Sequence, residues 1–144
     1  MLAPAVRRRG CFTRREFLEF AAWKSPRALP RCRTNEDAFV RAVTATALAT
    51  PSDRLRIEVL RLLNGVDWPT ASVLLHFAHA DPYPILDVRA LWTLGVSTPL
   101  AYSYDVWSAY TARCRALAAQ SGLSMRDLDR ALWQYSKSRQ GGGA

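Results

Sequence analysis

The sequence predicts an all-α fold of about seven helices. Apolar residues recur three and four positions apart along most of the chain, which is the spacing of one helix face. Small polar residues precede these segments and glycine or proline follows them, as at helix ends. No run alternates apolar and polar residues like a half-buried strand. We predict one domain over 13–139, after a basic flexible leader at 1–12 and before a flexible tail at 140–144.

The first helices are predicted from their N-terminal caps. Thr13 and Glu16 have the spacing of a capping box, and the apolar residues after them predict a helix over about 14–24. Residues 25–34 are expected to form a basic loop, because Pro26 disfavours helix in the residue before it. Asn35 is the predicted N-cap of the next helix.

The central helices are predicted from paired start and stop signals. A helix restarts at residues 51–53 and ends at Asn64-Gly65, because glycine adopts the left-handed backbone conformation at low cost. Asp67 can cap the following helix, and Pro69 fits its first turn, where no donor is needed.

The C-terminal helices are predicted in the same way. Asp87 stands at the start of a short helix that Gly95 closes. Ser103 begins a long helix that Gly122 ends, and Ser124 caps the last one.

The composition restricts the class of protein. With 144 residues, 49% of them hydrophobic, the chain suits one ordinary domain and not a large multidomain enzyme. No apolar stretch is long enough to span a membrane, and no secretory signal is visible, so we expect a cytoplasmic protein. The three cysteines are scattered without a C-x-x-C pair, which argues against a disulfide framework or a four-cysteine metal site.

The positive charge is concentrated at one end. Of 20 basic residues, nine lie within residues 1–34, beside only two acidic ones. Such a segment favours a polyanionic partner, either nucleic acid or an anionic membrane surface. The alternative is a solvated arm with no partner.

The most informative stretch joins a hairpin to a downstream aspartate. Residues 63–71 read L-N-G-V-D-W-P-T-A, with a glycine turn between two apolar helices. Residues 84–87, P-I-L-D, follow about twenty residues later. A glycine turn followed by a helix N-terminus exposes backbone N–H groups and predicts a phosphate site.

This arrangement resembles the helix-hairpin-helix DNA glycosylase superfamily over residues 55–95. The family's hairpin reads Leu-Pro-Gly-Val-Gly, then two variable residues and Thr-Ala, and its downstream segment ends in a catalytic aspartate. The resemblance implies double-stranded DNA as partner, held by its backbone, with Asp87 as the catalytic carboxylate of a monofunctional N-glycosylase that acts on an altered or mispaired base. The nucleic-acid-binding residues it implies are Asn64, Gly65, Val66, Asp67, Trp68, Thr70 and Arg89.

The chain departs from the family pattern at informative positions. Asp67 replaces the last hairpin glycine and puts a carboxylate where a phosphate would approach. Pro69 stands where lyase-active members carry lysine, so no Schiff base and no lyase activity are expected. The iron–sulfur cysteines are absent, and we expect no cofactor and no metal.

Each residue also has a structural interpretation. Asp87 can be only an N-cap, Arg89 a surface ion pair and Trp68 a core residue. His76 and His79 make an incomplete metal site and more simply a packed helix face. At the level of function, the alternatives to a glycosylase are a non-catalytic nucleic-acid-binding module and a helical protein-interaction module.

Charge alone does not support the hairpin as a DNA site. Residues 63–89 carry three aspartates against Arg89 alone. The basic segment therefore strengthens the hypothesis only where the fold brings it alongside the hairpin.

Overall fold

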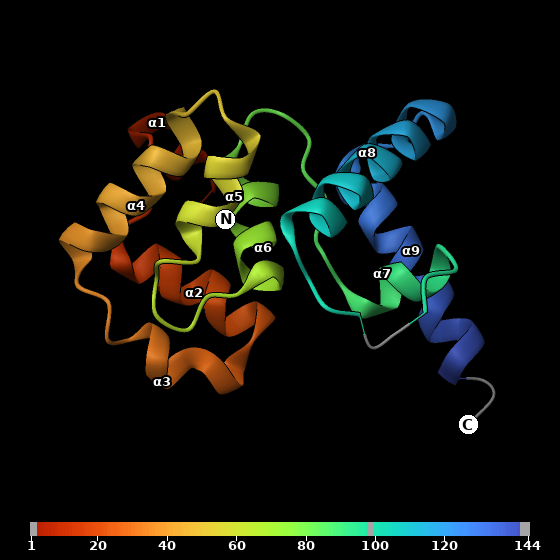
Figure 1. The fold of residues 1–144 in the computed structure, drawn as a ribbon, viewed down its shortest axis with the longest axis horizontal. Coiled ribbons are helices and arrows are strands. Elements are labelled where there is room, and N and C mark those ends of the chain that lie inside the picture. The colour runs from red at the N-terminus through yellow and green to blue at the C-terminus, as the bar shows by residue number, and fades with distance from the viewer. Residues whose placement is uncertain (1–2, 98–99, 142–144) are drawn as a thin grey trace. The chain divides into compact units, whose positions relative to one another are not determined.

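The computed structural model describes residues 3–97 and 100–141 (Figure 1). Within these residues the chain forms nine α-helices, one 3-10 turn and no strand, so the predicted all-α class is confirmed. The elements are α1 (Ala3–Arg9), α2 (Arg14–Lys24), η1 (Pro26–Ala28), α3 (Leu29–Cys32), α4 (Asp37–Ala49), α5 (Asp53–Leu60), α6 (Trp68–Ala78), α7 (Val88–Thr93), α8 (Tyr104–Ser121) and α9 (Met125–Gly141).

The chain divides into two compact units. Unit 1 is residues 1–81 and contains α1 to α6, and unit 2 is residues 82–144 and contains α7 to α9. The predicted domain over 13–139 extends across both units. No helix among the described residues combines the length and apolar character needed to cross a membrane.

The N-terminal segment is a helix where a flexible leader was expected. Val6 of α1 is fully buried and Phe12 is 1% exposed. The Phe12 amide donates to Thr44 Oγ1 over 2.9 Å, and the Arg7 guanidinium donates to the Phe77 carbonyl over 3.1 Å. These contacts hold residues 3–12 on unit 1, because two apolar side chains on one face outweigh the charge of the three arginines between them.

The two helices beyond the predicted seven are α1 and the short α3, which lies in the segment expected as a loop. The N-cap of α4 is Glu36, so the expectation for Asn35 is wrong by one residue. At the other end, α9 continues to Gly141, and residues 142–144 of the predicted tail lie outside the described residues.

The predicted capping box in unit 1 is confirmed, and the helix predicted to restart at 51–53 has a side-chain cap. Thr13 and Glu16 form a reciprocal capping box at α2. Ser52 accepts a hydrogen bond from the Leu55 amide at the start of α5. Buried Arg56 then fastens the α4–α5 turn by donating to Ala47 O and Thr50 O and by pairing with Asp53.

Aromatic rings fill the core of unit 1. Phe20 of α2 stacks on Phe77 of α6 with ring centroids 5.2 Å apart, and Phe12 meets Phe20 edge to face at 5.7 Å. This packing fixes α2 against α6, the second helix of the hairpin.

Unit 2 is built around α8 and α9. Ser103 caps α8, and Gly122 ends it in the left-handed conformation, both as predicted. Buried Tyr110 donates to the Ile85 carbonyl over 2.7 Å and ties the segment before α7 to α8. The Thr93 hydroxyl donates to the Leu132 carbonyl over 2.7 Å and ties α7 to α9.

Candidate functional site

A short turn joins α5 to α6 in unit 1, and we call these two helices and their turn the hairpin. After α5 ends at Leu60, the amides of Leu62 and Leu63 donate back to carbonyls of the last α5 turn over 3.1 Å. Helix α6 starts at Trp68, and Asp67 caps it by accepting a hydrogen bond from the Trp68 amide over 2.8 Å. Residues 61–67 therefore form the turn, and the preceding helix ends about four residues earlier than the predicted stop at Asn64-Gly65.

Gly65 places the hairpin backbone directly on α3. Its φ is +81°, in the left-handed region. A Cβ built there would lie 2.6 Å from Cys32 Sγ and 2.9 Å from the Cys32 amide nitrogen. Glycine is required at this position both by the backbone conformation and by the close approach of Cys32.

A buried asparagine holds the same two segments together. Asn35 is 3% exposed, and its side chain donates to the carbonyls of Cys32 (2.8 Å) and Asn64 (3.0 Å). Its Oδ1 accepts from the Asn64 amide over 2.9 Å, and the Asn64 side chain donates to Thr34 Oγ1 over 2.8 Å. We call these interactions the Asn35–Asn64 clamp.

The first turn of α2 fixes the other side of this segment. The Arg14 guanidinium donates to the carbonyls of Asn35 (3.0 Å) and Arg33 (2.8 Å). Residues 32–35 are thus bound between α2 and the hairpin, and the segment cannot move independently of either.

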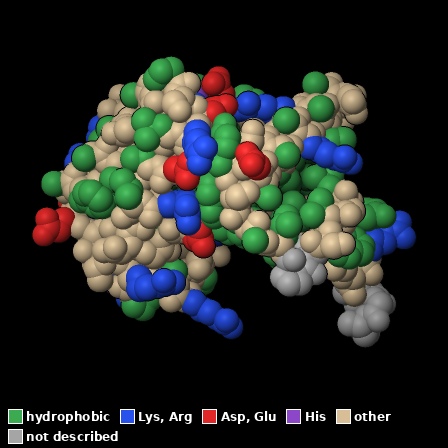
Figure 2. Space-filling view, in the orientation of Figure 1, with side chains coloured by type: hydrophobic (Ala, Val, Ile, Leu, Met, Phe, Trp, Pro, Cys, Tyr) green, Lys and Arg blue, Asp and Glu red, His purple; other side chains and the backbone are tan. Residues whose placement is uncertain are grey.

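The clamp brings part of the basic segment alongside the hairpin. The side chains of Arg31 and Arg33 are exposed next to Thr34, and Arg61 is exposed at the start of the turn. Figure 2 shows cationic side chains at the lower edge of unit 1, over the region of α3. We call this surface the hairpin face; it consists of Arg31, Arg33, Thr34, Arg61, Asn64, Gly65 and Asp67.

The carboxylate of Asp67 is offset by a neighbouring cation. Asp67 Oδ1 lies 3.2 Å from Arg61 Nε, and the Arg61 guanidinium lies 4.6 Å from the Trp68 ring centroid. Asp67 therefore forms an ion pair and a helix cap and is not an isolated negative charge.

Two backbone donors of the hairpin remain open. Within the described residues, no hydrogen bond is made by the amide N–H of Gly65 or of Asp67. Amide N–H groups without a partner beside the N-terminus of α6 can donate hydrogen bonds to an anion.

Three of the predicted binding side chains are corrected by the structure. Trp68 is 4% exposed and lies beneath Arg61, so its ring is not accessible to stack on a base. Val66 is 8% exposed and Thr70 is 4% exposed. These side chains are buried within unit 1, which leaves Asn64, Gly65 and Asp67 as the accessible hairpin members of the predicted set.

Asp87 and Arg89 lie in unit 2, where Asp87 is the N-cap of α7. Its Oδ1 accepts from the Arg89 amide over 3.0 Å, and its side chain is partly exposed. The Arg89 guanidinium lies 5.1 Å from the Trp133 ring centroid. Asp87 therefore has the capping geometry predicted for it, and the contact of the Arg89 guanidinium is with an aromatic ring.

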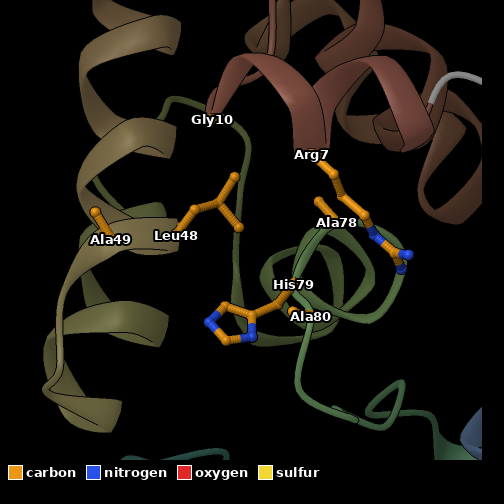
Figure 3. A pocket seen from close by; sticks show the side chains of 7 residues that line it. All are labelled: Arg7, Gly10, Leu48, Ala49, Ala78, His79 and Ala80. Atoms are coloured by element: carbon orange, nitrogen blue, oxygen red, sulfur yellow. The ribbon is translucent and has the colours of Figure 1, made fainter.

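The two histidines have packing partners in unit 1. His76 lies edge to face with Phe77, and His79 Nδ1 accepts from the Asp81 amide over 2.9 Å. Figure 3 shows the His79 ring pointing toward Leu48 in a mostly apolar pocket of about 310 Å³. In the described part of the chain, no group of three or more histidine, cysteine or acidic residues comes together.

The buried cysteines have no features of reactive thiols. Burial raises the pKa of the Cys114 thiol to about 11 and also raises the pKa of Cys32. A thiol that stays protonated near neutral pH is a poor nucleophile, so neither residue adds a reactive group to the site.

Comparison of the chain with protein-family models, curated proteins and solved structures gives no match.

Sequence reasoning missed the residues that build the hairpin face around the turn. Arg31 and Arg33 had only their charge as a signal, and nothing local joins them to a turn about thirty residues away, whereas Arg61 lies in a segment that was expected to be helical. The clamp residue Asn35 has the sequence context of an ordinary N-cap, so its role in tertiary packing has no local signal.

Proposed function

We propose that unit 1 binds double-stranded DNA through its phosphate backbone at the hairpin face. The observation that carries the proposal is the Asn35–Asn64 clamp, which holds the segment of exposed Arg31 and Arg33 against the hairpin, where the amides of Gly65 and Asp67 make no hydrogen bond. Arginine forks and backbone amides are the groups that proteins use to hold phosphates.

The same geometry supports binding that is indifferent to base sequence. The aromatic ring nearest the turn, Trp68, is buried, the Asn64 side-chain amide bonds Thr34, and the Arg61 guanidinium pairs with Asp67. Phosphate contacts set affinity and position without reading sequence. Affinity is therefore expected to fall steeply with salt.

The test replaces the two arginines of the clamp segment. Arg31→Gln/Arg33→Gln is expected to weaken binding of a labelled duplex about tenfold at low salt, measured by fluorescence anisotropy. Arg113→Gln/Arg130→Gln removes the same charge from exposed positions in unit 2 and is the matched control. Equal losses of duplex affinity in both variants would mean that net charge alone explains the effect, and would contradict the proposal.

Base removal is a second candidate function, supported by the position of Asp87. A partly exposed carboxylate at a helix N-terminus suits stabilisation of an oxocarbenium-like sugar. Asp87→Asn is expected to abolish base release from a panel of lesion duplexes while leaving binding unchanged. If the unaltered protein releases no base from these duplexes, the glycosylase hypothesis is excluded and the non-catalytic binding module remains.

A further inference from the structure

A second surface, in unit 2, combines exposed aromatic rings with cations. Trp92 of α7 and Trp133 and Tyr135 of α9 are 36%, 37% and 47% exposed. Three cations, Arg89, Lys137 and Arg139, lie against these rings. We call these six residues the aromatic–cationic patch, and Figure 2 shows hydrophobic and cationic side chains next to one another over the part of unit 2 where α7 and α9 lie.

The rings and cations of the patch are ordered by direct contacts. Arg89 and Lys137 lie 5.1 and 5.2 Å from the Trp133 ring centroid, and Arg139 lies 5.2 Å from that of Tyr135. The centroids of Trp92 and Tyr135 are 6.2 Å apart at an interplanar angle of 36°. Each cation is held near a ring by cation–π attraction, which orders these long side chains before any ligand binds.

The register of α9 places Trp133 and Lys137 on one flank of its buried stripe, and Tyr135 and Arg139 on the other flank. Leu132 and Ser136 on the same helix are buried, and the Thr93 hydroxyl bonds the Leu132 carbonyl to fix α7 beside it. Residues 133–139 include two cations and no carboxylate. Exposed tryptophans that a packed helix pair holds toward solvent are typical of a binding surface.

The chemistry of the patch selects its partner. Alternating rings and cations match a single nucleic-acid strand, whose bases stack on aromatic or guanidinium planes while its phosphates pair with the cations. A duplex offers no free base faces, and a second copy of this chain would bring like charges together. We propose that the patch binds single-stranded nucleic acid, independently of the duplex site proposed for the hairpin face.

The experiment measures binding of a labelled oligothymidylate of about 12 nucleotides, which forms no duplex. Trp133→Ala/Tyr135→Ala is expected to weaken binding at least about fivefold, because each stacked base is lost with its ring. Trp133→Phe/Tyr135→Phe keeps both rings and is expected to retain most of the affinity. Leu123→Ala removes another exposed apolar side chain of unit 2 and is the control.

The outcomes separate this proposal from the one for unit 1. Arg31→Gln/Arg33→Gln is expected to weaken duplex binding more than oligothymidylate binding. Trp133→Ala/Tyr135→Ala is expected to weaken oligothymidylate binding more than duplex binding. The proposal is overturned if the unaltered chain does not bind the oligonucleotide, or if the alanine variant, shown to be folded by circular dichroism, binds as well as the unaltered chain. Patch-dependent self-association, or preference for an acidic peptide, would also overturn it.

Discussion

Gly65 is the point at which the hairpin backbone touches α3, and two independent properties make it irreplaceable. The left-handed backbone conformation disfavours every side chain, and the Cys32 main chain leaves no room for a Cβ. The sequence predicts a turn at this glycine, and its positive φ confirms the turn. Its second property, the contact with a residue 33 positions earlier, follows from tertiary packing that no local pattern encodes.

Replacing Gly65 tests that close approach. Gly65→Ala is expected to lower the free energy of unfolding by about 2–4 kcal/mol, because strain from overpacking adds to the backbone cost. Gly122→Ala is the matched control, since it has a φ of +71° and no atom within 4 Å of the added Cβ. That variant should lose only about 1 kcal/mol. Equal losses in chemical denaturation would mean that the hairpin does not pack on α3 as described.

At the scale of elements, a small polar network joins α1 to the start of α2. Glu16 is 6% exposed and accepts two hydrogen bonds from the Arg9 guanidinium, over 2.6 and 3.1 Å, as well as one from the Thr13 amide. The Arg9 hydrogen bonds, followed by those of Thr13, lower the pKa of the Glu16 carboxyl below its ordinary value of 4.5. Helix α2 in turn holds residues 33–35, so this network supports the clamp.

The network makes unit 1 sensitive to acid. Because the folded-state pKa of Glu16 is depressed, its stabilisation is fully present above the unfolded-state value and is lost as the pH falls through the folded-state value, below about 4.5. Glu16→Gln is expected to cost about 2 kcal/mol of unfolding free energy at neutral pH and less in acid. Denaturation curves at several pH values measure the difference.

Glu19→Gln is the control for that substitution, because Glu19 is half-exposed and makes a longer ion pair, 3.5 Å, with Arg15. Its effect should stay below about 0.5 kcal/mol and vary little with pH. If Glu16→Gln shows no larger pH dependence than this control, the network does not stabilise the fold.

Helix ends were predictable from the sequence, whereas contacts between elements were not. The caps at Thr13, Ser52, Asp67, Asp87 and Ser103 depend on side chains one to three residues from the amides they bind, so local patterns identify them. Residues 3–9 form a helix where the sequence predicted a flexible leader. That prediction rested on the charge of the segment and not on the helical spacing of Ala3 and Val6. The clamp joins positions 29 residues apart, and only the folded chain reveals it.

At the scale of the whole molecule, the net charge of +8 is less informative than where the fold places it. Part of the basic N-terminal segment lies against the hairpin within unit 1, which is the arrangement that the DNA-binding hypothesis required. Other basic residues of that segment serve the fold instead: Arg9 pairs with Glu16, and Arg14 bonds backbone carbonyls. The arginines on either side of Cys32, Arg31 and Arg33, are exposed beside the clamp and are the ones that we assign to phosphates.

The most direct measurement is the salt dependence of duplex binding, compared between the unaltered chain and Arg31→Gln/Arg33→Gln. Each phosphate neutralised contributes about −0.9 to the slope of log affinity against log salt concentration, so the variant should have a slope shallower by about two. The Arg113→Gln/Arg130→Gln control should keep the original slope. An unchanged slope in the hairpin variant, or no duplex binding by the unaltered chain at low salt, would contradict the assignment of the hairpin face as a DNA-binding surface.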